Sequence, residues 1–181
     1  EWKELYELSI TYFEVMVMFR NIVRDWFAVT ASNYNAFLRA FLQDDLRAMN
    51  AYMNRTVLAT FSFFNGGNRP SEGEPERFYH GFVLGLMVEL ENRYIITSNR
   101  ESGFGRYDVM LEPRNKKDNA MILEFKVQDT DEKSLEDTVK AALEQIEAKQ
   151  YEVSLIEKGV PANHIRKYGF AFCGKQVLIG K

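Results

Sequence analysis

Cysteine is nearly absent from this sequence, and its scarcity excludes several kinds of site. Cys173 is the single cysteine, so neither an intrachain disulfide nor a cysteine-rich zinc site can form. No apolar run reaches the roughly 18 residues that a membrane-spanning helix needs, and the amino terminus lacks the basic and apolar regions of a secretory signal. These absences predict a protein of a reducing compartment, the cytoplasm, without a membrane partner.

An excess of positive charge is also missing. The chain has 23 Lys and Arg residues against 26 Asp and Glu residues, for a net charge of −3. A tight, non-specific nucleic-acid binder is therefore disfavoured. A nuclease is disfavoured less, because its active site is itself acidic before metal binds. The phosphate-loop pattern G-x-x-x-x-G-K-[ST] is absent too, so this chain is not expected to hydrolyse ATP through such a loop.

The apolar fraction of 46% and the 14 Phe, 9 Tyr and 2 Trp residues indicate a folded globular protein. Residues 1–64 look helical, with an apolar period of 3.6 residues from Tyr34 to Met49 and a second period that continues to Phe61. The stretch NGGNRPSEGEPE, Asn65–Glu76, is rich in glycine and proline and predicts a linker. We therefore predict a helical segment, 1–64, followed by a domain, 76–181. A chain that starts at Glu1 rather than at Met is expected to be a fragment of a longer protein.

The second part alternates between helix and strand patterns. A helix is predicted first and strands follow it, with β-branched residues in the first strand and a proline at the end of the second. The predicted elements are a helix over Arg77–Glu91, strands over Tyr94–Ser98, Tyr107–Pro113 and Ala120–Val127, a helix over Leu135–Tyr151, and one strand or a hairpin over Tyr168–Ile179. The predicted order is αβββαβ, an α/β fold.

The predicted strand Ala120–Val127 carries the most informative residues. Side chains alternate across a strand, so Glu124 and Lys126 share one face while the apolar residues share the other. Asp108, near the start of the preceding strand, lies opposite them if the two strands pair. Two carboxylates and a lysine suit phosphodiester hydrolysis, since carboxylates bind Mg²⁺ and lysine offsets negative charge. From these residues alone, a cross-strand salt bridge at a sheet edge remains an alternative.

Four segments resemble a known family of nucleases. FYHGFVLGLM, SNRESGFGRYDVMLEP, MILEFKV and QIEAKQY look like the nuclease domain that follows AAA-ATPase-like domains in many bacterial and archaeal proteins, a domain of the PD-(D/E)XK superfamily. The resemblance implies a restriction-endonuclease-like αβββαβ core with a mixed central sheet over residues 76–181. The helical segment 1–64 likewise resembles the part that precedes this domain, a linker or arm from an upstream ATPase-like module.

The resemblance also implies roles for individual residues. Asp108 takes the position of the first acid of the pattern, although Tyr107 stands where the PD proline would be. Glu124 and Lys126 take the positions of the (D/E)-x-K pair. The implied cofactor is Mg²⁺ or Mn²⁺, held by Asp108, Glu124 and, as in recombination-type exonucleases of the superfamily, a helix-borne histidine, here His80.

Two further residues of the resemblance lie on helices. Gln145 matches part of the glutamine-tyrosine motif of those exonucleases, but Tyr151 follows it by six residues rather than four. Glu89 and Glu91 compete with His80 for the role of helix-borne ligand. At 100° per residue, Glu89 points about 180° away from His80, and Glu91 lies about three turns further along the helix. We therefore favour His80.

Arg100 and Arg106 flank a glycine-rich loop and are candidates for contact with phosphate, or else ordinary solvated loop charges. These features together predict a Mg²⁺-dependent nuclease that acts on DNA, coupled to an ATPase-like domain upstream. A non-catalytic nucleic-acid-binding or assembly module that retained the nuclease fold is the alternative. The helical segment is expected to dock an upstream domain or to form a homodimer.

Overall fold

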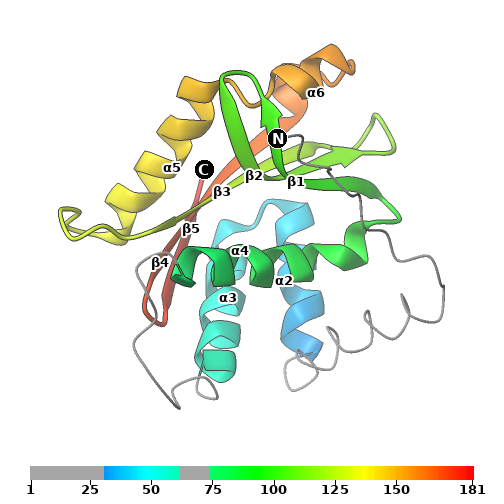
Figure 1. Cartoon of the computed structure of the whole chain (residues 1–181). Coiled ribbons are helices and arrows are strands. Elements are labelled where there is room, and N and C mark those ends of the chain that lie inside the picture. The colour runs from blue at the N-terminus through cyan, green and yellow to red at the C-terminus, as the bar shows by residue number, and fades with distance from the viewer. Residues whose placement is uncertain (1–30, 62–73) are drawn as a thin grey trace, which may run out of the picture.

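The computed structural model describes residues 31–61 and 74–181 (Figure 1). The helices predicted within residues 1–30 lie outside the described residues, as does most of the predicted linker. The elements are α2 (Ala31–Gln43), α3 (Leu46–Phe61), α4 (Glu74–Met87), η2 (Val88–Leu90), β1 (Tyr94–Ser102), β2 (Gly105–Pro113), β3 (Ala120–Val127), α5 (Leu135–Lys149), α6 (Val153–Glu157), η3 (Ala162–His164), β4 (Ile165–Cys173) and β5 (Gln176–Gly180). The predicted order αβββαβ is confirmed, with the last element a hairpin.

The five strands form one mixed sheet in the order β1-β2-β3-β4-β5. Strand β2 is antiparallel to both β1 and β3, β3 and β4 are parallel, and β4 and β5 are antiparallel. A parallel pair needs a crossover connection, and α5 supplies it. Helices α2, α3 and α4 lie on one side of the sheet, and α5 and α6 lie on the other (Figure 1).

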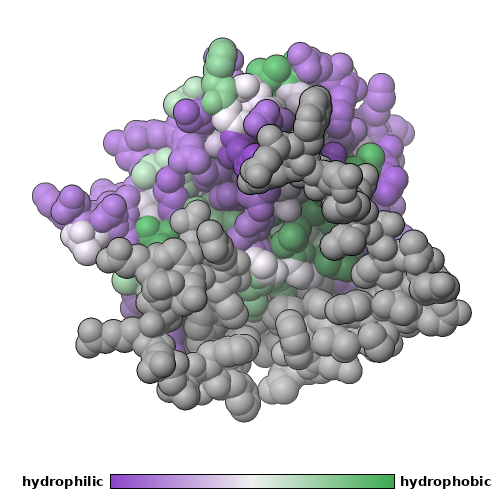
Figure 2. All heavy atoms as spheres, in the orientation of Figure 1, coloured by the Kyte–Doolittle hydropathy of each residue, from purple (hydrophilic) through white to green (hydrophobic). Residues whose placement is uncertain are grey.

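Two clusters of buried residues fill the spaces between these layers. The larger cluster joins α2, α3 and α4 to one face of the sheet and includes Phe41, Met53, Leu86 and Phe170. The smaller cluster joins α5 and α6 to the other face. Hydrophilic residues cover most of the described surface around α5 and α6 in the view of Figure 2. Within residues 31–61 and 74–181, no helix has the length and hydropathy to cross a membrane.

Helix α5 is set closely against the sheet. It begins after Ser134, whose backbone N–H donates to the Asp137 carboxylate at 3.2 Å in a capping box. On β4 beneath it, Gly169 leaves room for the helix backbone: a Cβ there would lie 2.8 Å from the carbonyl oxygen of Val139. The absence of a side chain at this position therefore sets the depth at which α5 packs.

The single helical period predicted from Tyr34 to Met49 is wrong in one respect, because the helix breaks at Asp44. The residue adopts a left-handed φ of 62°, and the chain restarts as α3. Its carboxylate accepts hydrogen bonds from the Tyr168 hydroxyl at 2.8 Å and from the Lys181 ammonium at 2.6 Å. These contacts come from β4 and the carboxyl end of the chain, so the break is stabilised by residues distant in sequence.

Helix α3 covers the edge strand β5 through two asparagine side chains. The Asn50 amide donates to the carbonyl of Ile179 at 2.8 Å and accepts from its N–H at 2.8 Å. The Asn54 amide does the same with Val177, at 2.6 Å and 2.9 Å. Each side chain therefore satisfies a donor and an acceptor that an edge strand would otherwise expose.

Replacing these asparagines is expected to destabilise the fold. We predict that Asn50→Ala and Asn54→Ala each lower the free energy of unfolding by about 1–3 kcal/mol, because each leaves two backbone groups without partners. Thermal or urea denaturation of the whole chain measures the effect. Arg47→Ala, an exposed position on the same helix, is the control. Equal stability of the asparagine variants and this control would contradict the prediction.

Candidate active site

The candidate site lies where β2 and β3 separate. Backbone pairing between these strands covers Val109 with Leu123, Met110 with Ile122, and Leu111 with Met121. One residue beyond Val109, the Asp108 carboxylate accepts a hydrogen bond from the backbone N–H of Phe125 at 2.8 Å. The Asp108 carboxylate therefore takes the place of a backbone carbonyl as the acceptor for the N–H of Phe125, and an acidic group lies between the two strands.

The chain is distorted at Asp108. In the pairing of β1 with β2, the register passes directly from the pair Ser98 and Val109 to the pair Arg100 and Tyr107. Asn99 has a positive φ of 52°. Residues two apart in a regular strand share a face, whereas Tyr107 joins the cluster beneath α5 and Val109 joins the opposite cluster. The distortion turns β2 at the residue that carries the acid.

Glu124 occupies the adjacent position on β3 and is buried, with 2% of its surface exposed. Its Oε1 accepts a hydrogen bond from the side-chain amide of Gln145 on α5. Its Oε2 is buried and has no hydrogen bond of standard geometry. A buried carboxylate oxygen without a partner is costly, so the site has an unused acceptor that is suited to a cation or a proton donor.

This environment favours the protonated form of Glu124. Burial raises its pKa from the usual 4.5 to about 8, and the negative charge of Asp108 adds to the rise. The positive charge of Lys126, the backbone amide of Asp108 and the Gln145 amide act in the opposite direction but are outweighed. Glu124 is therefore close enough to Asp108 and to Lys126 to respond to both charges.

Asp108 and Glu124 thus lie on the adjacent strands β2 and β3, and Lys126, two residues after Glu124 on β3, is half-buried. Two carboxylates, one with an unused buried oxygen, form a donor set of the hard oxygen type that Mg²⁺ and Mn²⁺ prefer. Within the part of the chain that the structure describes, no group of three or more His, Cys, Asp or Glu side chains is placed to hold a metal ion. A cation here would therefore have two acidic ligands and complete its shell with water.

Gln145 contacts both Glu124 and Tyr151. Its amide also donates to the Tyr151 hydroxyl at 3.3 Å, and that hydroxyl donates to the carbonyl of Arg106 at 2.7 Å. The spacing of six residues between Gln145 and Tyr151 is possible because α5 ends at a left-handed Gln150, φ 52°, which turns the chain back toward the sheet. The hydrogen bonds therefore run from Glu124 through Gln145 and Tyr151 to β2.

His80 is not gathered with the two acids in this structure. Its ring lies against Phe125, with ring centroids 5.6 Å apart, and Phe125 belongs to the face of β3 opposite Glu124. The Nε2 atom of His80 is buried without a hydrogen-bond partner. Of the competing glutamates, Glu89 is exposed in η2 and Glu91 is half-buried next to it.

Arg100 and Arg106 lie on the β1–β2 hairpin, and both are exposed. Arg100 pairs across the hairpin with Tyr107, and Arg106 pairs with Glu101. Arg106 is also the residue whose carbonyl accepts the Tyr151 hydrogen bond. Both side chains are thus solvent-exposed, unlike the buried Glu124.

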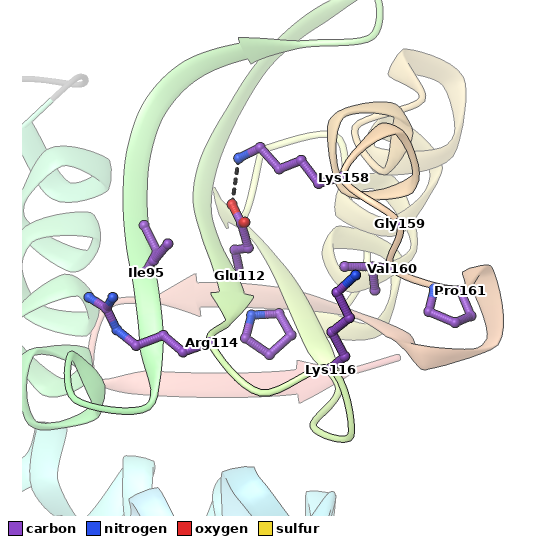
Figure 3. A pocket seen from close by; sticks show the side chains of 9 residues that line it. Ile95, Glu112, Arg114, Lys116, Lys158, Gly159, Val160 and Pro161 are labelled. Atoms are coloured by element: carbon purple, nitrogen blue, oxygen red, sulfur yellow. Dashed lines mark hydrogen bonds and ion pairs between the residues drawn. The ribbon is translucent and has the colours of Figure 1, made fainter.

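A separate hollow of about 320 Å³ lies at the far end of β2, between β1 and the segment after α6 (Figure 3). Ile95, Val160 and Pro161 supply apolar walls, and Lys116 points into it (Figure 3). On one side, Lys158 forms an ion pair with Glu112. None of the acids of the candidate site lines this hollow, so it is not part of that site.

The raised pKa of Glu124 predicts how the metal-free protein responds to pH. Between pH 4.5 and about 8 the folded chain retains a proton that the unfolded chain has lost, so stability falls as the pH rises through this window. Glu124→Gln removes the ionisation while its carbonyl can still accept from Gln145. We expect this variant to be more stable than wild type at pH 8, on the order of 1–3 kcal/mol or several degrees in Tm, and to lose this advantage by pH 4.5.

Thermal melts across this pH range in EDTA measure the difference. Glu144→Gln, which removes an exposed acid from α5, is the control. A difference between Glu124→Gln and wild type that stays constant from pH 4.5 to 8 would count against the ionisation argument.

Comparison with known proteins identifies the family. The PD-(D/E)XK nuclease superfamily matches residues 74–181, from the start of α4 to the end of the chain. No curated protein and no solved structure matches the chain. The mixed five-stranded sheet with its flanking helices is consistent with the restriction-endonuclease-like α/β fold. The chain belongs to the PD-(D/E)XK nuclease superfamily.

Proposed function

We propose that this chain is a nuclease that hydrolyses phosphodiester bonds of DNA with Mg²⁺ or Mn²⁺. The observation that carries the proposal is the state of Glu124: a buried acid with an unused oxygen, next to Asp108 and Lys126 in the D…E-x-K pattern of the superfamily. Most buried carboxyl oxygens that serve the fold alone have a hydrogen-bond partner, and Glu124, unlike Glu152 with its ion pair to Lys167, has no ion-pair partner at 4 Å or less among the described residues to offset the missing bond.

Each residue has a distinct part in the proposed reaction. Asp108 and Glu124 would hold the cation, whose chemistry is to polarise the phosphate and lower the pKa of bound water. Lys126, half-buried on the same strand, would orient the attacking water or offset the negative charge that develops on the phosphate. Gln145 keeps the Glu124 carboxylate in place through its hydrogen bond.

The alternative is a non-catalytic module that binds nucleic acid or assembles with a partner. The net charge of −3 slightly favours the assembly form of this alternative, because it disfavours tight nucleic-acid binding. The buried acid argues against it, because a negative charge aimed at phosphate weakens binding unless a cation neutralises it. We therefore prefer the enzymatic proposal and treat the binding module as an outcome of the following test.

Substitution of the acid and of the lysine separates metal binding from catalysis. We predict that Asp108→Asn abolishes cleavage and weakens the stabilisation by Mn²⁺, since it removes a charged ligand. Lys126→Ala should lower the cleavage rate by about 10²-fold or more but keep the stabilisation, because both carboxylates remain. For wild type, several millimolar Mn²⁺ should add about 1–3 kcal/mol to the free energy of unfolding.

Cleavage is measured on supercoiled and linear DNA in Mg²⁺, Mn²⁺ or EDTA, and metal binding by thermal denaturation. Lys140→Ala, which removes an exposed lysine from α5, serves as the control. If the metal ions leave the melting of wild type unchanged and no DNA is cleaved, the binding module is the better description.

A further inference from the structure

Phe104, at the tip of the β1–β2 hairpin, is the most exposed large apolar side chain among the described residues, with 73% of its surface accessible. The two other exposed large apolar side chains of this part are Ile95 at 40% and Ile156 at 46%. Neither is at the hairpin tip, because Ile95 is near the start of β1 and Ile156 is on α6. The phenyl ring is thus an isolated apolar feature.

The backbone that carries this ring is firmly held. The N–H of Phe104 donates to the carbonyl of Lys149 at 2.7 Å. One residue earlier, Gly103 has φ 60° and approaches the end of α5 so closely that a Cβ would lie 2.2 Å from the same carbonyl oxygen. The buried Ser102 hydroxyl donates to the carbonyl of Tyr151 at 2.7 Å. The outward direction of the ring is therefore not a result of a loosely attached loop.

The tip has a local excess of positive charge. Arg100, Arg106 and Lys149 are exposed around it, against the exposed acids Glu101 and Glu147. The side chain of Lys149 passes directly beside Gly105, since a Cβ at that glycine would lie 3.1 Å from its Cδ. Two acids near the end of α5 are paired, because Lys167 binds Glu147 at 2.8 Å and Glu152 at 3.2 Å.

The ring also lies within reach of the proposed site. Phe104 precedes Asp108 by four residues, about 13 Å at the rise of a strand, which corresponds to about four stacked nucleotides. The hydrogen bonds from Arg106 through Tyr151 and Gln145 end at Glu124. The position of the tip relative to the acids is therefore fixed by named contacts.

We propose that Phe104 stacks on an unpaired base of the DNA substrate, so that the hairpin tip holds a single-stranded or frayed strand as it enters the site. The inference rests on the proposed nuclease function and gives it a substrate class. A single ring among cations suits base stacking, which needs one aromatic face and a charged path for phosphate. It is too small for a protein interface, which buries about 800 Å² on each partner.

Binding assays without cleavage test the proposal. The probe is a single-stranded DNA oligonucleotide that contains one 2-aminopurine, compared with a blunt duplex of the same sequence, in EDTA. We expect Phe104→Ala to weaken single-strand binding about tenfold, within the range for loss of one stacked base, and to abolish the quenching of 2-aminopurine. Phe104→Trp should retain both, and binding to the duplex should change less than twofold.

Ile156→Ala is the matched control, since it removes another exposed apolar side chain and should leave binding unchanged. The proposal is overturned if Phe104→Ala binds the single strand like wild type, or if it loses single strand and duplex equally. Cleavage by wild type is measured separately. If the protein binds single strands through Phe104 but cleaves no DNA, the nuclease proposal is refuted and the stacking site stands. If the protein cleaves DNA and Phe104→Ala leaves cleavage unaffected, the stacking site is refuted and the nuclease proposal stands.

Discussion

The burial of the Glu124 carboxyl group is the constraint on which the surrounding structure depends. A strand at the centre of the sheet is the position where a carboxylate is most costly, because water cannot reach it. The glycine at position 169 lets α5 approach until Gln145 can donate to that carboxyl group. Tyr151 then ties the same amide to β2. Helix, hairpin and sheet thus meet around one buried carboxyl group, whose second oxygen has no hydrogen-bond partner among the described residues.

The location of the acids was predictable from sequence because strands impose a period of two. That period placed Glu124 and Lys126 on one face of a predicted strand, with Asp108 opposite them if the two strands paired. Strands β2 and β3 do pair, and the Asp108 carboxylate accepts a hydrogen bond from the N–H of Phe125. The hydrophobic periods likewise predicted the element order. Gln145 was identified by resemblance, and the structure joins it to Glu124.

Other features have no local signal. The turn of β2 at Asp108 depends on a left-handed Asn99 in the neighbouring strand, and a strictly alternating pattern assumes that no such turn occurs. The break at Asp44 depends on Tyr168 and Lys181, more than a hundred residues away. A helical wheel gave a direction for His80 but did not indicate the aromatic ring of Phe125 beside it. Each of these required knowledge of distant contacts.

The asparagines of α3 show how a helix can replace a missing strand. Residues four apart on a helix rise about 6 Å, and residues two apart on a strand rise about 7 Å, so Asn50 and Asn54 can match Ile179 and Val177 with little error. Because the two rises differ by about 1 Å for each such step, a longer helix and strand would lose this alignment, whereas the short strand β5 keeps it. The superfamily match begins at residue 74, after α3. The residues that cover the edge strand β5 therefore lie before the part of the chain that matches the superfamily.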